Sequence, residues 1–135
     1  NATYYSALGA SDEKMLLARA IQMFMPGKPQ VWYLDLFAGK NDHEAVQRAG
    51  ESGHKEINRT NLSTDQITEG LKKDVVQKQL ALIRMRNTHK AFSEGAEVAI
   101  SGGERSLEIR WEYNSAFATL YVNFESGTYT IVESK

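Results

Sequence analysis

The chain has 135 residues, with 16 Lys and Arg against 17 Asp and Glu, a formal net charge of −1, and no Cys. The charge balance argues against a dedicated nucleic-acid binder, and the lack of Cys excludes disulfides and thiolate metal sites. Apolar residues make up 41% of the chain, enough for a core, and no run of about 18 apolar residues predicts a membrane span. The composition suits a cytoplasmic protein with one domain or two very small ones.

A helix is predicted over residues 11–25, because Ser11 is a good N-cap and two acidic residues follow it. Apolar residues then recur at helical spacing until Pro26-Gly27 ends the helix. The next apolar run, 30–34, does not alternate with polar residues. It therefore predicts a strand that is buried on both faces, as in a parallel sheet.

The middle of the chain, residues 35–62, is a long polar stretch, and long loops in compact domains are often functional. A short helix is expected within it, over residues 42–49. Ser63 and Gln66 then form a capping box that starts another short helix. A longer amphipathic helix is predicted over residues 75–91.

The last third of the chain has a hydrophobic period of two, which predicts antiparallel strands. We expect four of them, at residues 97–100, 107–113, 117–124 and 129–132, in a β-meander. Gly102-Gly103 is interpreted as a turn and not as a phosphate loop, because no helix follows it.

The predicted fold class is therefore α+β: helix, buried strand, polar loop, two helices and a small antiparallel sheet. A lone buried strand cannot be a sheet, so its neighbours are missing and we expect the chain to be a piece of a longer protein. A strand followed by a long polar loop is typical of one turn of a (β/α)8 barrel. In such barrels, function lies on the loops after the strands.

Five segments, in order and at similar spacings, resemble the sucrose phosphorylase group within glycoside hydrolase family 13. They are Thr3–Gly9, Pro26–Tyr33, Gly39–Asp42, Ile57–Arg59 and Arg86–Thr88. The resemblance implies that residues 1–92 are the C-terminal segment of a catalytic (β/α)8 barrel, with residues 30–34 as its eighth strand. Residues 93–135 would be a C-terminal antiparallel β-domain.

The resemblance also implies the activity: a retaining glycosyltransferase that moves a glucosyl group from sucrose, or a similar α-glucoside, to phosphate and gives glucose 1-phosphate. Retaining chemistry needs two carboxyl groups about 5 Å apart. In the family these acids lie on earlier strands, so none is expected in this chain, which would be inactive alone. The group needs no metal or other cofactor.

The substrate-binding residues implied by the resemblance are Arg59, Asn58, Lys55 and His54. The Arg of the family's Ile-Asn-Arg motif holds a hydroxyl of the glucosyl ring in the donor subsite, a task that suits a planar guanidinium. The alternative for Arg59 is a structural role in anchoring the loop. Asn58 is expected to shape the loop backbone.

The sequence around this motif departs from that of most sucrose phosphorylases, which have Gly-Arg-Asp before it and His-Tyr-Tyr after it. His54-Lys55-Glu56 and Thr60-Asn61-Leu62 stand there instead, which looks more like the glucosylglycerate phosphorylases. Their acceptor, glycerate, carries a carboxylate that His54 or Lys55 is placed to pair with. The alternative for Lys55 is a solvated surface charge.

Other polar candidates are interpreted as structural. Asp35 follows the predicted strand, and we expect it to cap or bond a local amide. Asp42, His43 and Glu44 match no standard metal-ligand spacing and are expected to be solvated loop residues.

Three aromatic residues, Trp32, Tyr33 and Trp111, are expected to pack in the core rather than to stack on sugars. Their indole and hydroxyl groups would then need hydrogen-bond partners.

Two hypotheses remain open: a piece of a phosphorylase, or a stand-alone binding or assembly module that never carried catalysis. The unpartnered strand at 30–34 favours the first. As an isolated piece, the chain is expected to self-associate through this strand and the apolar face of helix 11–25.

Overall fold

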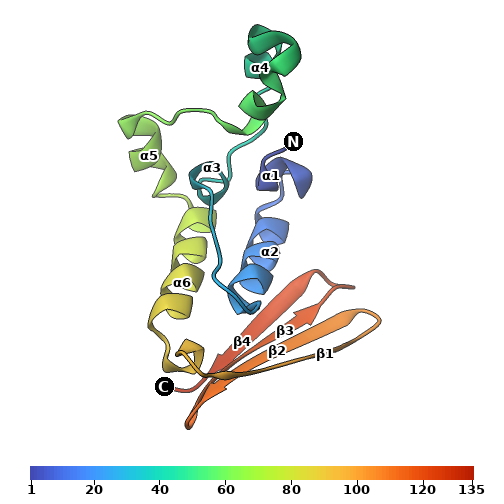
Figure 1. Cartoon of the computed structure of the whole chain (residues 1–135), viewed down its shortest axis with the longest axis vertical. Helices are drawn as coiled ribbons and strands as arrows, with labels where there is room; N and C mark the ends of the chain where they lie inside the picture. The colour runs from blue at the N-terminus through green and yellow to red at the C-terminus, as the bar shows by residue number, and fades with distance from the viewer. The chain divides into compact units, whose positions relative to one another are not determined.

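A computed structural model describes all residues from 1 to 135. Figure 1 shows the elements, which in chain order are α1 (Tyr4–Ala7), α2 (Asp12–Phe24), α3 (Tyr33–Leu36), α4 (His43–Ala49), the 3-10 segment η1 (Gly50–Asn58), α5 (Thr64–Gly70), α6 (Asp74–Thr88), the 3-10 turn η2 (Lys90–Phe92), β1 (Glu97–Gly103), β2 (Ser106–Tyr113), β3 (Ala116–Asn123) and β4 (Thr128–Glu133). The α+β class with a small antiparallel sheet is confirmed. None of the helices combines the length and apolar composition that crossing a bilayer requires.

The chain divides into two compact units. The first consists of Asn1–Met15 and Gln30–Lys78, and the second of Leu16–Pro29 and Gln79–Lys135. This division does not test the domain boundary expected at residue 92, which remains a prediction about the parent protein.

In the first unit, the N-terminal segment is tied to the segment that follows α3. The buried Thr3 caps α1 and donates its backbone N–H to the Asn41 side chain at 2.7 Å. The Asn41 N–H in turn donates to the Ser6 hydroxyl at 2.9 Å. These reciprocal bonds hold a four-residue helix that its own sequence is too short to stabilise.

Residues 30–34 do not form the predicted strand. The Trp32 backbone is extended, but the chain then turns into α3, where the Leu36 N–H donates to the Trp32 carbonyl at 3.1 Å. A strand needs a neighbouring strand to pair its backbone groups, and the sheet contains only β1 to β4. The backbone here closes local helical hydrogen bonds instead.

The polar stretch 35–62 was expected to be mainly loop but is largely short helices. The helix predicted at 42–49 is confirmed as α4, with Asp42 as its N-cap. The capping box of Ser63 and Gln66 is also confirmed, with both of its hydrogen bonds present at the start of α5.

In the second unit, β1 to β4 form the predicted meander, with each strand antiparallel to the next. Gly102 and Gly103 are not a turn: they lie in β1 opposite Leu107 and Ser106. A Cβ on Gly102 would stand 2.5 Å from the Ser106 carbonyl oxygen. The two glycines therefore permit close approach of the strands, and the chain reverses between β1 and β2.

One face of the sheet forms the core of the second unit with the end of α2. Ile109, Trp111 and Leu120 alternate inward and are buried, as are Met23 and Phe24 of α2. Core packing of Trp111 is thereby confirmed, and its indole N–H donates to the Phe24 carbonyl at 2.6 Å.

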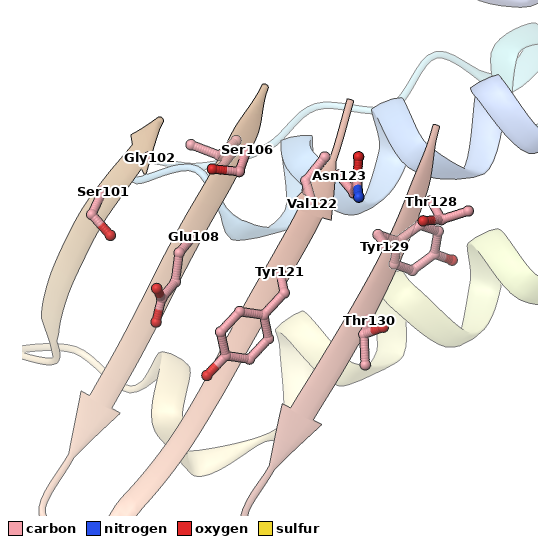
Figure 2. Close-up of a pocket in the computed structure, with 11 residues that line it drawn as sticks. Ser101, Gly102, Ser106, Glu108, Tyr121, Val122, Asn123, Thr128, Tyr129 and Thr130 are labelled. Atoms are coloured by element: carbon pink, nitrogen blue, oxygen red, sulfur yellow. The ribbon is translucent and has the colours of Figure 1, made fainter. Parts of the chain in front are cut away.

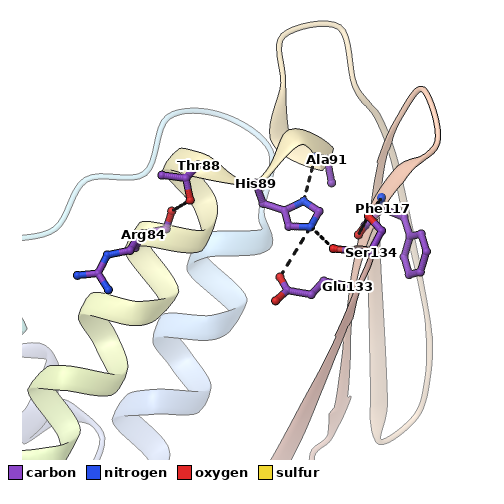
Figure 3. A network of polar contacts seen from close by, with 7 residues as sticks. All are labelled: Arg84, Thr88, His89, Ala91, Phe117, Glu133 and Ser134. Atoms are coloured by element: carbon purple, nitrogen blue, oxygen red, sulfur yellow. Dashed lines mark hydrogen bonds and ion pairs between the residues drawn. The ribbon is translucent and has the colours of Figure 1, made fainter.

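Helix α6 ends at Thr88, three residues before the predicted end, because His89 takes an extended conformation and caps η2. Its Nδ1 accepts from the Ala91 N–H at 3.1 Å, and its Nε2 lies 2.7 Å from the Ser134 carbonyl oxygen (Figure 3). Since Nδ1 is an acceptor, Nε2 carries the proton and donates it. The imidazole thus joins the end of α6 to the segment after β4.

Candidate functional site

The four predicted substrate-binding residues lie on one segment, the end of η1 and the residue that follows it. The side chains of His54 and Lys55 are exposed to solvent and make no hydrogen bond or ion pair within the chain. Asn58 is half-buried, and its side-chain amide donates to the Ala2 carbonyl at 3.5 Å. The loop-shaping role expected for Asn58 stays a prediction.

Arg59 is the cation at the end of this segment. Its Nη1 lies 3.5 Å from the Glu56 carboxylate, and the two side chains are 50% and 43% exposed. An ion pair this exposed contributes little to stability. A guanidinium has five N–H donors, so most of them are available for hydrogen bonds to a ligand.

The backbone on both sides of Arg59 is held by two aromatic side chains. The indole N–H of Trp32 donates to the Asn58 carbonyl at 3.0 Å, and the hydroxyl of Tyr33 donates to the Thr60 carbonyl at 2.8 Å. The expected core packing of these two residues is wrong, since Trp32 is 48% and Tyr33 37% exposed. This role was not predicted from the sequence, although the need of the indole N–H and the phenol hydroxyl for hydrogen-bond partners was a signal for it.

Asp42 holds the same segment from the other end of the loop. Its backbone N–H donates to the Ile57 carbonyl at 2.9 Å, and its carboxylate accepts from the Thr60 hydroxyl at 3.4 Å. Together with the two aromatic donors, these bonds fix residues 57–60 by side chains and backbone from two other parts of the first unit.

The remaining acidic candidates have structural partners. Asp35 accepts from the Tyr4 N–H at 2.8 Å, which confirms that it binds a backbone amide, although one distant in sequence. Glu44 lies 3.7 Å from Arg48 on the surface of α4. No group of three His, Asp or Glu side chains is arranged to hold a metal ion.

Cavities lie outside this segment in both units. In the first unit, a cavity of about 400 Å³ is bordered by α3 and α5. In the second unit, a cavity of about 560 Å³ lies over the four strands (Figure 2), and Glu108 is the single carboxylate among its lining residues. Another cavity of about 380 Å³ in the second unit is lined by the end of α6, His89 and Glu133. None of these includes a predicted substrate-binding residue, and the cavity over the sheet lacks the pair of carboxylates that retaining chemistry needs.

No family model matches the chain, but known proteins similar to it are named as phosphorylases. It is 53% identical over 131 residues to sucrose 6(F)-phosphate phosphorylase of Ilumatobacter coccineus, covering 97% of this chain and 25% of the relative. It is 43% identical to sucrose phosphorylase of Agrobacterium vitis, covering 99% and 27%. The crystal structure of sucrose 6F-phosphate phosphorylase from Thermoanaerobacter thermosaccharolyticum matches with a TM-score of 0.92 at 41% identity, over 100% of this chain and 27% of that one.

The chain thus spans about a quarter of the length of these relatives. The expected likeness to glucosylglycerate phosphorylases is also found, since the enzyme of that name from Escherichia coli is 29% identical over 68% of this chain. The identity to the sucrose 6(F)-phosphate phosphorylase is higher and extends further.

Proposed function

This chain is a sucrose phosphorylase-like sequence, and we propose that it forms one part of a retaining α-glucoside phosphorylase. The whole protein would transfer a glucosyl group to phosphate and release glucose 1-phosphate. In a retaining mechanism, one carboxylate attacks the anomeric carbon while an acid protonates the leaving oxygen. Phosphate then attacks the covalent glucosyl intermediate, with the second carboxyl group acting as the base.

The observation that carries this proposal is the match along nearly the whole chain at 53% identity, together with the TM-score of 0.92. The alternative of a stand-alone module is not favoured, because each of these relatives is about four times as long. We place the two reacting carboxylates in the remainder of the protein. Residues 1–92 would then close the barrel, and residues 93–135 would form its C-terminal β-domain.

Within this chain, Arg59 is proposed to bind the donor glucosyl ring. Its guanidinium is half-exposed and has one weak ion-pair partner, Glu56. A guanidinium in this state can donate two parallel hydrogen bonds to vicinal sugar hydroxyls, while Glu56 keeps its plane oriented.

The leaving group is proposed to be anionic. His54 and Lys55 are exposed and unpaired in the same segment, so the side chain of either can bind a phosphate or a carboxylate group of the substrate. Sucrose 6(F)-phosphate is our first candidate donor, because the relative at 53% identity is named for it. Sucrose and glucosylglycerate are further candidates, since other relatives are named for them.

The proposal extends to location and assembly. A cytoplasmic enzyme is consistent with the absence of Cys. The isolated chain is expected to self-associate, because Trp32, Tyr33, Ile67 and Leu71 are exposed in its first unit. Sedimentation velocity at increasing concentration tests this, and a single monomeric species throughout would contradict it.

Glucose 1-phosphate formation tests the function. The 135-residue chain and a full-length protein that contains it are each incubated with phosphate and one of three donors: sucrose 6(F)-phosphate, sucrose or glucosylglycerate. We expect product only from the full-length protein, and fastest from the phosphorylated donor. Turnover by the isolated chain, or none by the full-length protein with any donor, would overturn the proposal.

A further inference from the structure

Arg59 is flanked by two carbonyl groups whose hydrogen-bond donors come from adjacent positions of the chain. Trp32 holds the carbonyl of the residue before Arg59, and Tyr33 holds the carbonyl of the residue after it, at 3.0 and 2.8 Å. The two rings contact each other with centroids 4.8 Å apart. The donors therefore act as a pair that spans Arg59.

Burial does not explain why these two side chains occupy this surface. Both are large aromatic residues that remain more than a third exposed, so much of the free energy that burying them would provide is not realised. What they do provide is two directional donors on a single short rigid element.

That element is itself fixed. Leu34, the next residue in α3, is buried, and its carbonyl accepts from the Gly39 N–H at 2.9 Å. A Cβ on Gly39 would stand 2.5 Å from a Leu34 methyl carbon, so the turn after α3 packs directly on this side chain. Asp35 adds its bond to the Tyr4 N–H. Trp32 and Tyr33 therefore donate to the Arg59 segment from a part of the chain that is held in place by packing and hydrogen bonds.

Fixing both neighbouring carbonyls limits the backbone dihedrals of Arg59 and so the direction of its Cα–Cβ bond. The guanidinium stands at the end of a long flexible side chain, and a small rotation at the backbone is magnified there. Glu56 alone cannot compensate, because it lies in the same segment and would move with Arg59.

From this arrangement we propose that Trp32 and Tyr33 are positioning residues for Arg59, orienting its guanidinium toward the donor glucosyl group. The inference rests on the proposed function of Arg59 and adds a structural cause for its orientation. It assigns to two exposed aromatic residues a role other than sugar stacking or core packing.

The test uses the full-length protein and the single-atom change Tyr33→Phe, which removes the hydroxyl and keeps the ring. Misplacing a substrate-binding group by a fraction of an ångström to 1 Å costs about 10-fold to 100-fold in rate. We expect kcat/KM to fall about 10-fold, with kcat falling as well, for every donor tested. Tyr121→Phe is the matched control, since Tyr121 is 45% exposed and its hydroxyl makes no hydrogen bond within the chain.

A double-mutant cycle separates positioning from general stability. If Tyr33 acts through Arg59, Tyr33→Phe should cause little further loss in an Arg59→Lys background. Additive losses in the double mutant would overturn the positioning role and leave the proposed function standing. The same holds if Tyr33→Phe is as active as Tyr121→Phe while Arg59→Lys is impaired. A fully active Arg59→Lys enzyme would overturn the donor-binding role of Arg59 together with the positioning role of Trp32 and Tyr33.

Backbone hydrogen exchange gives a readout that does not depend on activity. In Tyr33→Phe and Trp32→Phe, amides of residues 57–61 should exchange about 3-fold to 5-fold faster, while those of β1 to β4 are unchanged. Unchanged exchange in residues 57–61 would contradict the proposal whatever the activity of the full-length protein.

Discussion

The indole N–H of Trp111 in β2 donates a 2.6 Å hydrogen bond to the carbonyl oxygen of Phe24, the last residue of α2 and 87 positions earlier in the chain. Trp111 is 7% exposed and Phe24 is fully buried. The bond satisfies one of the carbonyls that every helix leaves unpaired at its C-terminus. It does so where water has little access, and it fixes the sheet to the end of the helix.

The first prediction compares the two tryptophans of the chain. Trp111→Phe leaves the buried Phe24 carbonyl without its donor and opens a cavity, so the free energy of unfolding should fall by about 2–4 kcal/mol. Trp32→Phe breaks a similar indole–carbonyl bond at an exposed site, where water replaces the donor, and should cost less than about 1 kcal/mol. Urea denaturation measures both. Equal losses would contradict the role assigned to burial.

The second prediction concerns Arg86, which serves the same helix end. Its guanidinium donates to the carbonyls of Met23, Met25 and Gly27 at 2.6, 3.0 and 2.7 Å, and it stacks 4.3 Å from the Trp111 ring centroid. Desolvation lowers the pKa of Arg86 from its ordinary value, but a guanidinium remains charged at neutral pH.

Lysine cannot reproduce the fork of donors that binds three carbonyls. Arg86→Lys should therefore lower the free energy of unfolding by about 1–3 kcal/mol, and Arg86→Ala by more. Thermal denaturation provides the measurement. Arg84→Lys is the control, because the Arg84 side chain is exposed and makes no contact of this kind. Similar melting temperatures for the two lysine variants would argue against the proposed contribution of Arg86.

The third prediction is a pH dependence. The Tyr5 hydroxyl donates to the Asp12 carboxylate at 2.8 Å. This hydrogen bond, with smaller contributions from desolvation and from the charge of Asp12, raises the pKa of Tyr5 above its ordinary value. The folded state therefore keeps the phenolic proton at a pH where the unfolded chain loses it.

Because the pKa of Tyr5 is higher in the folded state, this bond stabilises the fold fully at pH values below the unfolded pKa of about 10. The stabilisation disappears as pH rises through the raised pKa of the folded state. Wild type should be more stable than Tyr5→Phe at pH 8, and this difference should shrink to near zero in strongly alkaline solution. Guanidinium denaturation across about pH 8 to pH 11.5 measures it. A difference that is constant with pH would show that the bond is not formed.

The fourth prediction concerns Arg59 and Lys55 in the full-length protein. A charged hydrogen bond to a sugar hydroxyl is worth about 1.5–3 kcal/mol, so Arg59→Lys should lower kcat/KM about 10-fold to 100-fold. The loss should be similar for all donors, because they share the glucosyl group. Lys55→Ala should impair only donors whose leaving group is anionic and leave sucrose unaffected. Steady-state kinetics with the three donors would rule out the donor-site role if Arg59→Lys were impaired with one donor only.

Local patterns were sufficient for much of the fold. Ser63 and Gln66 lie three residues apart and satisfy each other's backbone groups, so the start of α5 could be predicted without knowledge of its neighbours. The four strands alternate and are joined by short connections, and the meander follows from the sequence order. Antiparallel neighbours supply each other's hydrogen bonds within a few dozen residues, so this sheet needs no distant partner.

The conformation of residues 30–34 and the support of the Arg59 backbone were decided only by tertiary structure. An apolar run fits a buried strand or a helix equally well, and the choice is made by whether another strand is present to pair with it; here none is, and α3 forms. The motif around Arg59 was recognisable from sequence, but its support was not, since the donors from Trp32 and Tyr33 lie 26 and 27 residues away from the carbonyls they hold. Side-chain hydrogen bonds across such separations leave no periodic pattern, because they are set only when the intervening helices have folded.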